Sequence, residues 1–141
     1  MTPVAVRPAT TADHDAVLRL LRELDLDYAE RDLARFVVAE SAGEVVGIAE
    51  VREFPAFCLL SCVGVREDLQ GRGLGRALVL GAIAGVRKDV RLFTLVPGFF
   101  ERLGFARAAQ EPPGVVPRLL YRCDECRPDR CTSMVRRHDA V

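Results

Sequence analysis

The chain has 141 residues, a length typical of one domain. Half of the residues are hydrophobic and 28% are charged, which supplies a compact core and excludes an intrinsically disordered chain. Because 20 Lys and Arg residues balance 20 Asp and Glu residues, no global field attracts nucleic acid or an anionic membrane. We therefore expect a single domain over residues 1–141 that binds its ligand at a local site, with no nucleic-acid or membrane partner.

The N-terminal residues 1–10 lack the charged and then apolar layout of a signal peptide, and no stretch reaches the ~18 apolar residues of a membrane span. This predicts a soluble, cytoplasmic protein. The five cysteines are an odd number, which in such a chain favours thiols, a metal site or redox chemistry over a disulfide framework.

The first third of the chain predicts a strand, a helix and a hairpin. Residues 4–7 are apolar enough for a short strand, and Thr10 with Asp13 supplies helix-start chemistry. Apolar residues then recur at helical spacing between residues 13 and 26, namely Val17, Leu20, Leu21 and Leu24. Two strands, 36–39 and 45–54, are expected to form a hairpin around the glycine-containing loop 41–44.

The rest of the chain alternates between strands and helices. Residues 57–65 form an apolar, β-branched run typical of a central strand. A helix at 76–86, a strand at 90–96, a short helix at 99–103 and a return strand from Phe105 are expected to follow, with a last strand at 119–121. The fold class is therefore α/β (α+β), a mixed central sheet flanked by helices, with a core over about residues 4–107 and a Cys- and Arg-rich segment at 118–141.

A glycine-rich turn, Gln70–Arg76, connects the central strand to the next helix. Glycines let a ligand approach the backbone, and the unpaired N–H groups at the start of a helix attract an anion such as a pyrophosphate. A turn that only reverses the chain is the alternative. A Walker phosphate loop is excluded because no Lys-Ser or Lys-Thr follows the glycines, and a Rossmann turn fits poorly because a hairpin precedes it.

At these residues the sequence resembles the GCN5-related N-acetyltransferases, the GNAT superfamily. Their motif of Gln or Arg, two residues, Gly, one residue and then Gly or Ala is matched by Gln70, Gly73 and Gly75. The resemblance extends over about residues 4–107 through the opening 7–10, the strand 60–65 and the Phe-Phe-Glu to Gly-Phe segment at 99–105.

The resemblance implies acetyl transfer from acetyl-CoA to a primary amine by direct attack in a ternary complex. It implies that the turn's backbone amides bind the CoA pyrophosphate and that main-chain groups of the preceding strand pair with the pantetheine arm. Positioning and polarisation of the thioester carbonyl would then supply most of the catalysis. The cofactor-binding residues expected on this basis are Val63, Val65, Gln70, Gly71, Arg72, Gly73, Leu74, Gly75 and Arg76.

Proton transfer departs from the pattern of the relatives. Leu59 and Phe100 occupy the positions where relatives carry a carboxylate base and a Tyr acid. The candidate bases are instead Glu50 and Glu53, and the candidate proton donors are solvent, Ser61, Cys62 and Tyr121. Glu50 and Ser61 are the catalytic residues we expect, although a solvated or packing role is the alternative for each of these side chains.

The Phe-Phe pair at 99–100 is similar to short amino-acid N-acetyltransferases of the N-acetylglutamate synthase type and to N-acetyltransferases associated with arsenic resistance. Three cysteines followed by Met134 favour the first group, so an amino acid such as glutamate is a candidate acceptor. The resemblance also implies a homodimer. Two alternatives stay open: an acyl-CoA-binding sensor or interaction module without turnover, and a protein N-acetyltransferase.

The C-terminal cysteines allow more than one interpretation. Cys123, Cys126, Cys131 and His138 could supply four zinc ligands, but the later spacings match no common zinc module, so we expect no metal and free thiols in a packed tail. Arginines outnumber acids between residues 118 and 137, which either attracts an acidic substrate or the phosphates of CoA, or forms a solvated surface.

Overall fold

A computed structural model describes residues 4–24, 26, 32–109 and 131–138 of the chain. Contacts divide the chain into two compact units, with the strand at 57–65 shared between them. The first unit contains residues 60–85 and most of the chain up to residue 52, and the second contains residues 53–59 and the chain from Val86 onward. Among the described residues, no helix is long and apolar enough to cross a membrane.

The first unit begins with β1 (Val4–Pro8) and a single 3-10 turn (Thr11–Asp13) that leads into α1 (His14–Glu23). Asp13 Oδ2 accepts hydrogen bonds from the backbone N–H and the hydroxyl of Thr10, so the predicted helix start is confirmed. The apolar stripe of α1 is buried through Val17, Leu20 and Leu21. The α-helix is shorter than the predicted range of 13–26, because its first turn is tighter than an α-helix and its last helical residue is Glu23.

The hairpin of the first unit follows a second 3-10 turn (Leu33–Arg35). Its strands are β2 (Phe36–Ser41) and β3 (Glu44–Glu53), joined by the two residues Ala42 and Gly43, both with positive φ. This is the backbone conformation that matches the twist of paired strands, and it explains why β2 runs two residues beyond the predicted 36–39. β1 pairs antiparallel with β2, and β2 pairs antiparallel with β3.

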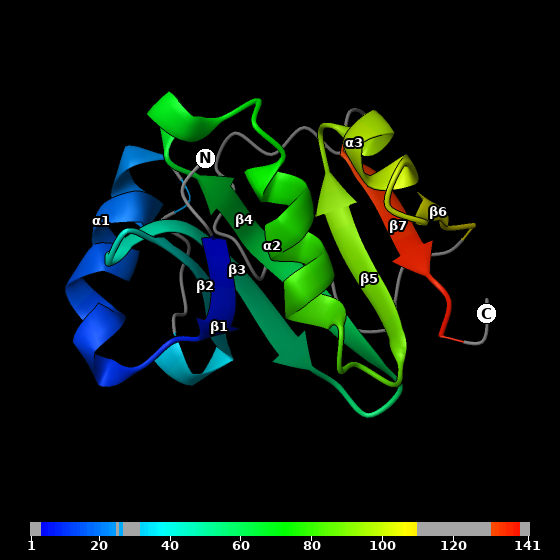
Figure 1. The fold of residues 1–141 in the computed structure, drawn as a ribbon. Coiled ribbons are helices and arrows are strands. Elements are labelled where there is room, and N and C mark those ends of the chain that lie inside the picture. The colour runs from blue at the N-terminus through cyan, green and yellow to red at the C-terminus, as the bar shows by residue number, and fades with distance from the viewer. Residues whose placement is uncertain (1–3, 25, 27–31, 110–130, 139–141) are drawn as a thin grey trace. The chain divides into compact units, whose positions relative to one another are not determined.

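The central strand β4 (Phe57–Val65) has the predicted bounds. It is followed by a 3-10 turn (Glu67–Leu69) and by α2 (Leu74–Ile83), which packs on β1 and β2 (Figure 1). A Cβ added at Gly47 of β3 would meet Leu78 of α2, whereas one added at Gly64 of β4 would meet Leu24 after α1. Leu78 of α2 therefore lies close to β3, and Leu24 after α1 lies close to β4. The fully buried side chains of this unit include Leu21, Val38, Ile48, Leu78 and Val79.

The second unit contains β5 (Asp89–Thr94), α3 (Pro97–Glu101), β6 (Ala106–Arg107) and β7 (Thr132–Arg136). β5 is parallel to the first three residues of β4, and β7 is antiparallel to both β5 and β6. Strand β7 was missed by the sequence analysis, which treated residues 118–141 as a tail. The strand predicted at 119–121 lies outside the described residues.

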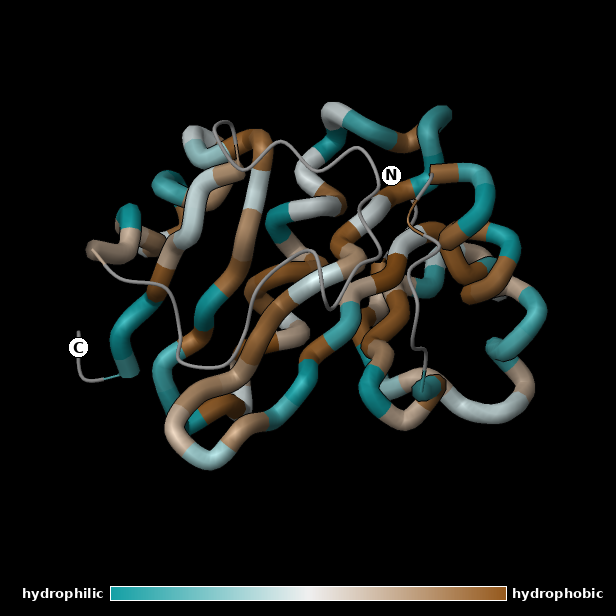
Figure 2. The backbone as a smooth tube through the Cα atoms, turned by 180° about the vertical axis from the view of Figure 1, so that it is seen from behind, coloured by the Kyte–Doolittle hydropathy of each residue, from teal (hydrophilic) through white to brown (hydrophobic). Residues whose placement is uncertain are grey.

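Aromatic contacts hold the second unit together. The rings of Phe54 and Phe57 stack with centroids 4.8 Å apart beside Leu59. Phe100 makes edge-to-face contacts with Phe99 and Phe105 at 4.9 and 5.6 Å. Such pairs contribute about 0.5–1.5 kcal/mol each beyond their buried area. Hydrophobic residues are frequent along the strands, and hydrophilic residues mark several connections (Figure 2).

Hydrogen bonding among the described residues links seven strands in the order β1-β2-β3-β4-β5-β7-β6. The sheet is mixed, because the β4–β5 pair is parallel and the other ladders given above are antiparallel. The predicted α/β class with a mixed central sheet flanked by helices is confirmed.

Candidate active site

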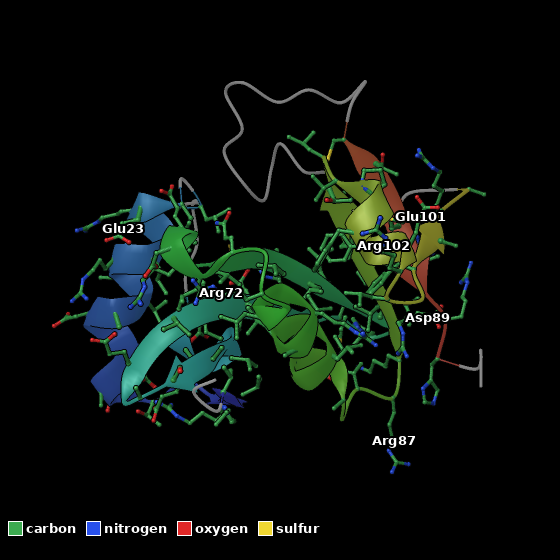
Figure 3. The ribbon with its side chains drawn as sticks, turned by 45° about the horizontal axis from the view of Figure 1, so that its top comes forward. Glu23, Arg72, Arg87, Asp89, Glu101 and Arg102 are labelled. Atoms are coloured by element: carbon green, nitrogen blue, oxygen red, sulfur yellow. The ribbon has the colours of Figure 1, made fainter. Side chains whose placement is uncertain are left out.

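The predicted glycine turn lies between β4 and α2. Gly73 precedes the first helical residue, Leu74, and has a left-handed φ of 80°. Gly71 has a similar φ of 78°. Non-glycine residues rarely adopt this conformation, so the two glycines permit the path by which the chain enters the helix. Figure 3 shows Arg72 on this connection.

Hydrogen bonds from Gln70 and Arg66 hold the connection that leads from β4 to the glycine turn. The Gln70 side-chain Nε2 donates to the backbone carbonyl of Val65 at 3.0 Å. Arg66 donates its backbone N–H to the Val46 carbonyl at 2.8 Å, and its guanidinium bonds to Asp68 and Glu44 at 2.7 and 3.0 Å. The hydrogen bond from Arg66 also lowers the pKa of Asp68 below its ordinary value. Gln70 therefore ties the turn to β4, and Arg66 ties the start of the connection to β3.

The start of α2 fits a diphosphate. Ala77 N–H bonds to the Gly73 carbonyl at 3.2 Å, so the N–H groups of the three preceding residues lack a partner within the helix. A Cβ added at Gly71 or Gly73 would meet no atom within 4 Å, which leaves room for a ligand against the backbone. The nearby Arg72 and Arg76 are exposed and form no hydrogen bond with another described residue. These donors, this space and these charges are what a pyrophosphate requires.

Val63 and Val65, the strand residues expected to contact the pantetheine arm, lie at the end of β4. The β4–β5 ladder runs from Phe57↔Asp89 to Leu59↔Arg91 and does not include either valine. Between them and the ladder lies Cys62, a non-glycine residue with a left-handed φ of 51°. A backbone conformation of this kind costs about 1–3 kcal/mol. It also interrupts the regular alternation of side chains between the two faces of the sheet. The Val65 carbonyl is already engaged by Gln70.

The two expected catalytic residues lie in contact with each other. Glu50 on β3 is buried, with 4% of its surface exposed. Its Oε1 accepts a hydrogen bond from Ser61 Oγ on β4 at 2.8 Å. Its Oε2 is buried and has no hydrogen-bond partner among the described residues. The structure therefore brings together Glu50 of β3 and Ser61 of β4.

Glu53, the other candidate base, has a different environment. It is exposed, and its Oε1 accepts a hydrogen bond from Lys88 Nζ at 2.7 Å. This bond lowers the pKa of Glu53 below its ordinary value. Lys88 also donates to the Phe54 carbonyl at 2.9 Å. Glu53 therefore belongs to a surface ion pair.

Of the remaining residues considered for proton transfer, Leu59 and Phe100 supply no acid or base, whereas Cys62 carries a thiol. Leu59 is buried at 1% exposure and carries no titratable group. Phe100 is buried between two other aromatic rings, and its ring has no proton to donate. Cys62 Sγ lies 4.0 Å from the Leu26 carbonyl. Tyr121 lies outside the described residues.

Two of the four candidate zinc ligands of the tail, Cys131 and His138, lie within the described residues. Cys123 and Cys126 lie outside the described residues. Cys131 is half-buried immediately before β7, and the backbone N–H of His138 donates to Asp89 Oδ1 at 3.0 Å. Within the described part of the chain, no three His, Cys, Asp or Glu side chains are grouped to hold a metal ion.

A model of a known protein family matches the part of the chain that holds this site. The model of the acetyltransferase (GNAT) domain matches residues 32–107, more than half of the chain. The chain belongs to the GNAT acetyltransferase family. The match spans β2 to β6, and it includes the glycine turn, Glu50 and Ser61. The resemblance inferred from the motif is thus confirmed, and this GNAT domain is an N-acetyltransferase with acetyl-CoA as its acetyl donor.

Individual proteins extend the similarity beyond the matched region. An uncharacterized N-acetyltransferase of Chlorobaculum tepidum is 26% identical over 136 residues, which are 86% of this chain and 86% of that protein. An amino-acid acetyltransferase of Ralstonia nicotianae is 28% identical over 132 residues, 82% of this chain. This chain spans only 29% of the length of the Ralstonia enzyme.

Solved structures share the fold. N-acetylglutamate synthase of Neisseria gonorrhoeae, complexed with coenzyme A and N-acetyl-glutamate, aligns with a TM-score of 0.72 at 21% identity and covers 97% of this chain, which spans 35% of that protein. A Mycobacterium tuberculosis protein in complex with CoA aligns with a TM-score of 0.73 at 22% identity, over 94% of this chain and 98% of its own. Both are similar in architecture to the GNAT domain described above.

Proposed function

We propose that this GNAT domain transfers the acetyl group of acetyl-CoA to the primary amine of a small molecule, with an amino acid such as glutamate as the leading candidate. The observation that carries the proposal is the open, positively flanked N-terminus of α2 at Gly73, together with membership of the family. The acetyl donor would be held by the turn Gln70–Arg76, and the reaction would be direct attack in a ternary complex.

The turn supports CoA binding through its backbone more than through its side chains. The unpaired N–H groups at the start of α2 would donate to the pyrophosphate, and Gly71 and Gly73 leave the space for it. Arg72 and Arg76 would add two exposed positive charges. Gln70 would act differently, because its side chain bonds to Val65 and would shape the turn without contacting the ligand.

A small amine as the acceptor is supported by the relatives. The Ralstonia relative acetylates amino acids by its name, and the Neisseria structure holds N-acetyl-glutamate. In the transfer, the neutral amine nitrogen attacks the thioester carbonyl, a C–N bond forms and the C–S bond breaks. One proton leaves the ammonium form before the attack. A second leaves the nitrogen once the C–N bond has formed, and the sulfur of CoA takes up a proton as the C–S bond breaks.

A second candidate is an acyl-CoA-binding module without turnover. Leu59 and Phe100, which cannot exchange protons, favour this alternative. A protein N-acetyltransferase is the third candidate, because a plant enzyme crystallised with a CoA–peptide bisubstrate analogue shares the fold at a TM-score of 0.69 and 14% identity. All three candidates use the same CoA site. The two transferases differ in the acceptor, and the binding module has none.

The function is tested by mixing the protein with acetyl-CoA and a panel of acceptors. We expect acetyl-CoA to raise the Tm in a saturable manner, and at least one of L-glutamate, other amino acids, spermidine and kanamycin to release free CoA thiol. Saturable stabilisation without thiol release from any acceptor would support the binding module. Release with an N-terminal peptide alone would support the protein N-acetyltransferase. Absence of stabilisation by acetyl-CoA would contradict the proposed cofactor site.

A further inference from the structure

The buried carboxylate of Glu50 has one oxygen bonded and one oxygen without a partner. Glu50 is 4% exposed, and Oε1 accepts the hydrogen bond of the Ser61 hydroxyl at 2.8 Å. Oε2 has no hydrogen-bond partner among the described residues. A buried carboxylate oxygen that lacks a hydrogen bond is costly, because nothing replaces the water that it lost on burial. Native structures rarely retain such a group unless it meets a ligand, a water or a functional partner.

Glu50 on β3 lies beside the middle of β4, just before the residues expected to contact the pantetheine arm. Arg66 N–H bonds to the Val46 carbonyl, and Phe54 N–H bonds to the Phe57 carbonyl, so the two strands run antiparallel between these points. Glu50 meets Ser61 between them. Ser61 is followed by the left-handed Cys62 and then by Val63, the first strand residue expected to contact the pantetheine arm. Glu50 is therefore near the strand segment where the thioester would be held.

We propose that Glu50 Oε2 binds the ammonium group of the acceptor and takes its proton, and that Ser61 is a positioning residue that holds Oε1. The proposal rests on the proposed acetyl transfer and deepens it. It implies that the acceptor arrives as a cationic primary ammonium, because a negatively charged, desolvated oxygen favours a cation over a neutral hydroxyl. The proton moves from the ammonium nitrogen to Oε2, and the neutral amine that remains is the nucleophile.

Ser61 acts through Glu50 and does not exchange a proton with the substrate. Its hydroxyl donates to Oε1, which restrains the carboxylate and leaves the other oxygen for the incoming ammonium. The conservative variant Ser61→Thr keeps this donor, whereas Ser61→Ala removes it. A purely structural serine would affect stability alone, but a positioning serine also lowers kcat while leaving the KM for acetyl-CoA unchanged.

The chain offers a matched control on the same strand. Glu53 is also a glutamate of β3, but it is exposed and paired with Lys88 at 2.7 Å. Glu50→Gln and Glu53→Gln make the same chemical change in the two environments. The amide introduced by Glu50→Gln retains an oxygen that can accept from Ser61, so the packing of the pair is preserved.

The experiment measures kcat and KM for the most active acceptor of the panel of L-glutamate, spermidine and kanamycin, and the Tm shift produced by acetyl-CoA. Glu50→Gln is expected to lower kcat/KM for the amine about 100-fold or more, the usual contribution of a positioned base, with the acetyl-CoA-induced Tm shift retained. Ser61→Ala is expected to lower kcat about 10-fold, less than the loss of a positioned base itself, and Ser61→Thr to restore most of it. Glu53→Gln is expected to remain at the wild-type rate.

Three results would overturn the inference. Glu50→Gln could retain activity within about twofold of the wild type, a change far smaller than that produced by the loss of a positioned base. Glu53→Gln could lose as much activity as Glu50→Gln. The wild type could bind acetyl-CoA but show neither thiol release nor an amine-dependent Tm shift with any member of the panel, which would overturn the proposed transfer together with this inference. Failure of the wild type to bind acetyl-CoA would overturn the proposed cofactor site. The first two results require an active wild type, so failure of the inference alone is distinguishable from failure of the proposed function.

Discussion

The side-chain amide of Gln70 donates a 3.0 Å hydrogen bond to the backbone carbonyl of Val65, which ties the glycine turn to the last residue of β4. The motif glutamine thus stabilises the loop, and the groups that we propose to face the ligand are the backbone amides that follow it. The turn's shape therefore depends on a side chain that precedes the glycines in the sequence.

Replacing Gln70 tests this relationship. Gln70→Ala removes the donor to Val65, and we expect a loss of about 1 kcal/mol in the free energy of unfolding, the usual net value of one hydrogen bond. The affinity for acetyl-CoA should fall about 5- to 10-fold, because the same free energy then opposes ordering of the turn. Isothermal titration and chemical denaturation measure the two effects. An unchanged affinity would show that the turn keeps its shape without this bond.

Gly73→Val tests the ligand space at the start of α2. Gly73 has a φ of 80°, and a Cβ there would meet no atom within 4 Å. Valine adds backbone strain of about 1–3 kcal/mol and fills the space that we assign to the pyrophosphate. We expect acetyl-CoA binding to become undetectable by isothermal titration.

Gly43→Val is the matched control for that variant. Gly43 has a similar φ of 78° and also has no atom within 4 Å of an added Cβ, but it lies in the β2–β3 turn. The strain should therefore be comparable, while acetyl-CoA affinity stays at the wild-type value. Equal losses of affinity in the two variants would attribute the effect of Gly73→Val to strain alone.

Gly81→Ala tests the close approach of α2 to β1. A Cβ at Gly81 would lie 2.7 Å from Val6 Cγ1 and 2.9 Å from Val6 Cβ. The branched valine is fixed near the backbone and cannot move aside, so we expect a loss of about 1–3 kcal/mol in the free energy of unfolding. Gly85→Ala, two residues beyond α2 in open space, should be neutral or stabilise by about 0.5 kcal/mol. Chemical denaturation compares them, and a stabilised Gly81→Ala would contradict the contact.

Asp13 should make stability depend on pH. Arg7 hydrogen-bonds to both carboxylate oxygens of Asp13 at 2.8 and 3.0 Å, and this holds the pKa of Asp13 well below its ordinary value of 3.8. The unfolded chain therefore binds the proton more readily than the folded chain does. The stabilisation is present above about pH 4 and is lost as the pH falls below that value.

Asp13→Asn measures that contribution. We expect it to cost about 2 kcal/mol at neutral pH, the range for hydrogen bonds to a charged group, and the difference from the wild type to shrink as the pH falls below about 4. Asp15→Asn removes a carboxylate that is 95% exposed and should change stability by less than about 0.5 kcal/mol. Urea denaturation at several pH values gives both differences. A constant difference between Asp13→Asn and the wild type across these pH values would contradict the assignment.

The elements that the sequence predicted well are those whose signal is local. β4 has the predicted bounds because an apolar run is enclosed by Pro55 and the charged residues 66–68. The start of α1 follows from the Thr10 and Asp13 side chains, and the turn before α2 follows from its glycines. In each case the chemistry that fixes the backbone lies within a few residues of the structure that it forms.

The elements that were missed depend on partners far away in the chain. The five residues of β7 carry a weak strand signal, and they are a strand because β5 and β6 supply hydrogen-bonding partners on both sides. The left-handed backbone of Cys62 likewise has no signature in residue type, since cysteine does not prefer that conformation.

The sequence by itself determined the family, through the spacing of Gln70, Gly73 and Gly75, and the position of the turn to which we assign the cofactor. It offered Glu50 and Glu53 as candidate bases on one predicted strand and favoured Glu50. Only the tertiary structure showed how their environments differ, because burial and a partner from β4 give Glu50 one bonded and one unpartnered oxygen, whereas exposure gives Glu53 an ion pair with Lys88. The environment of each carboxylate is set by packing between strands. That packing brings together residues that are distant in the sequence, so no local sequence pattern predicts the contact.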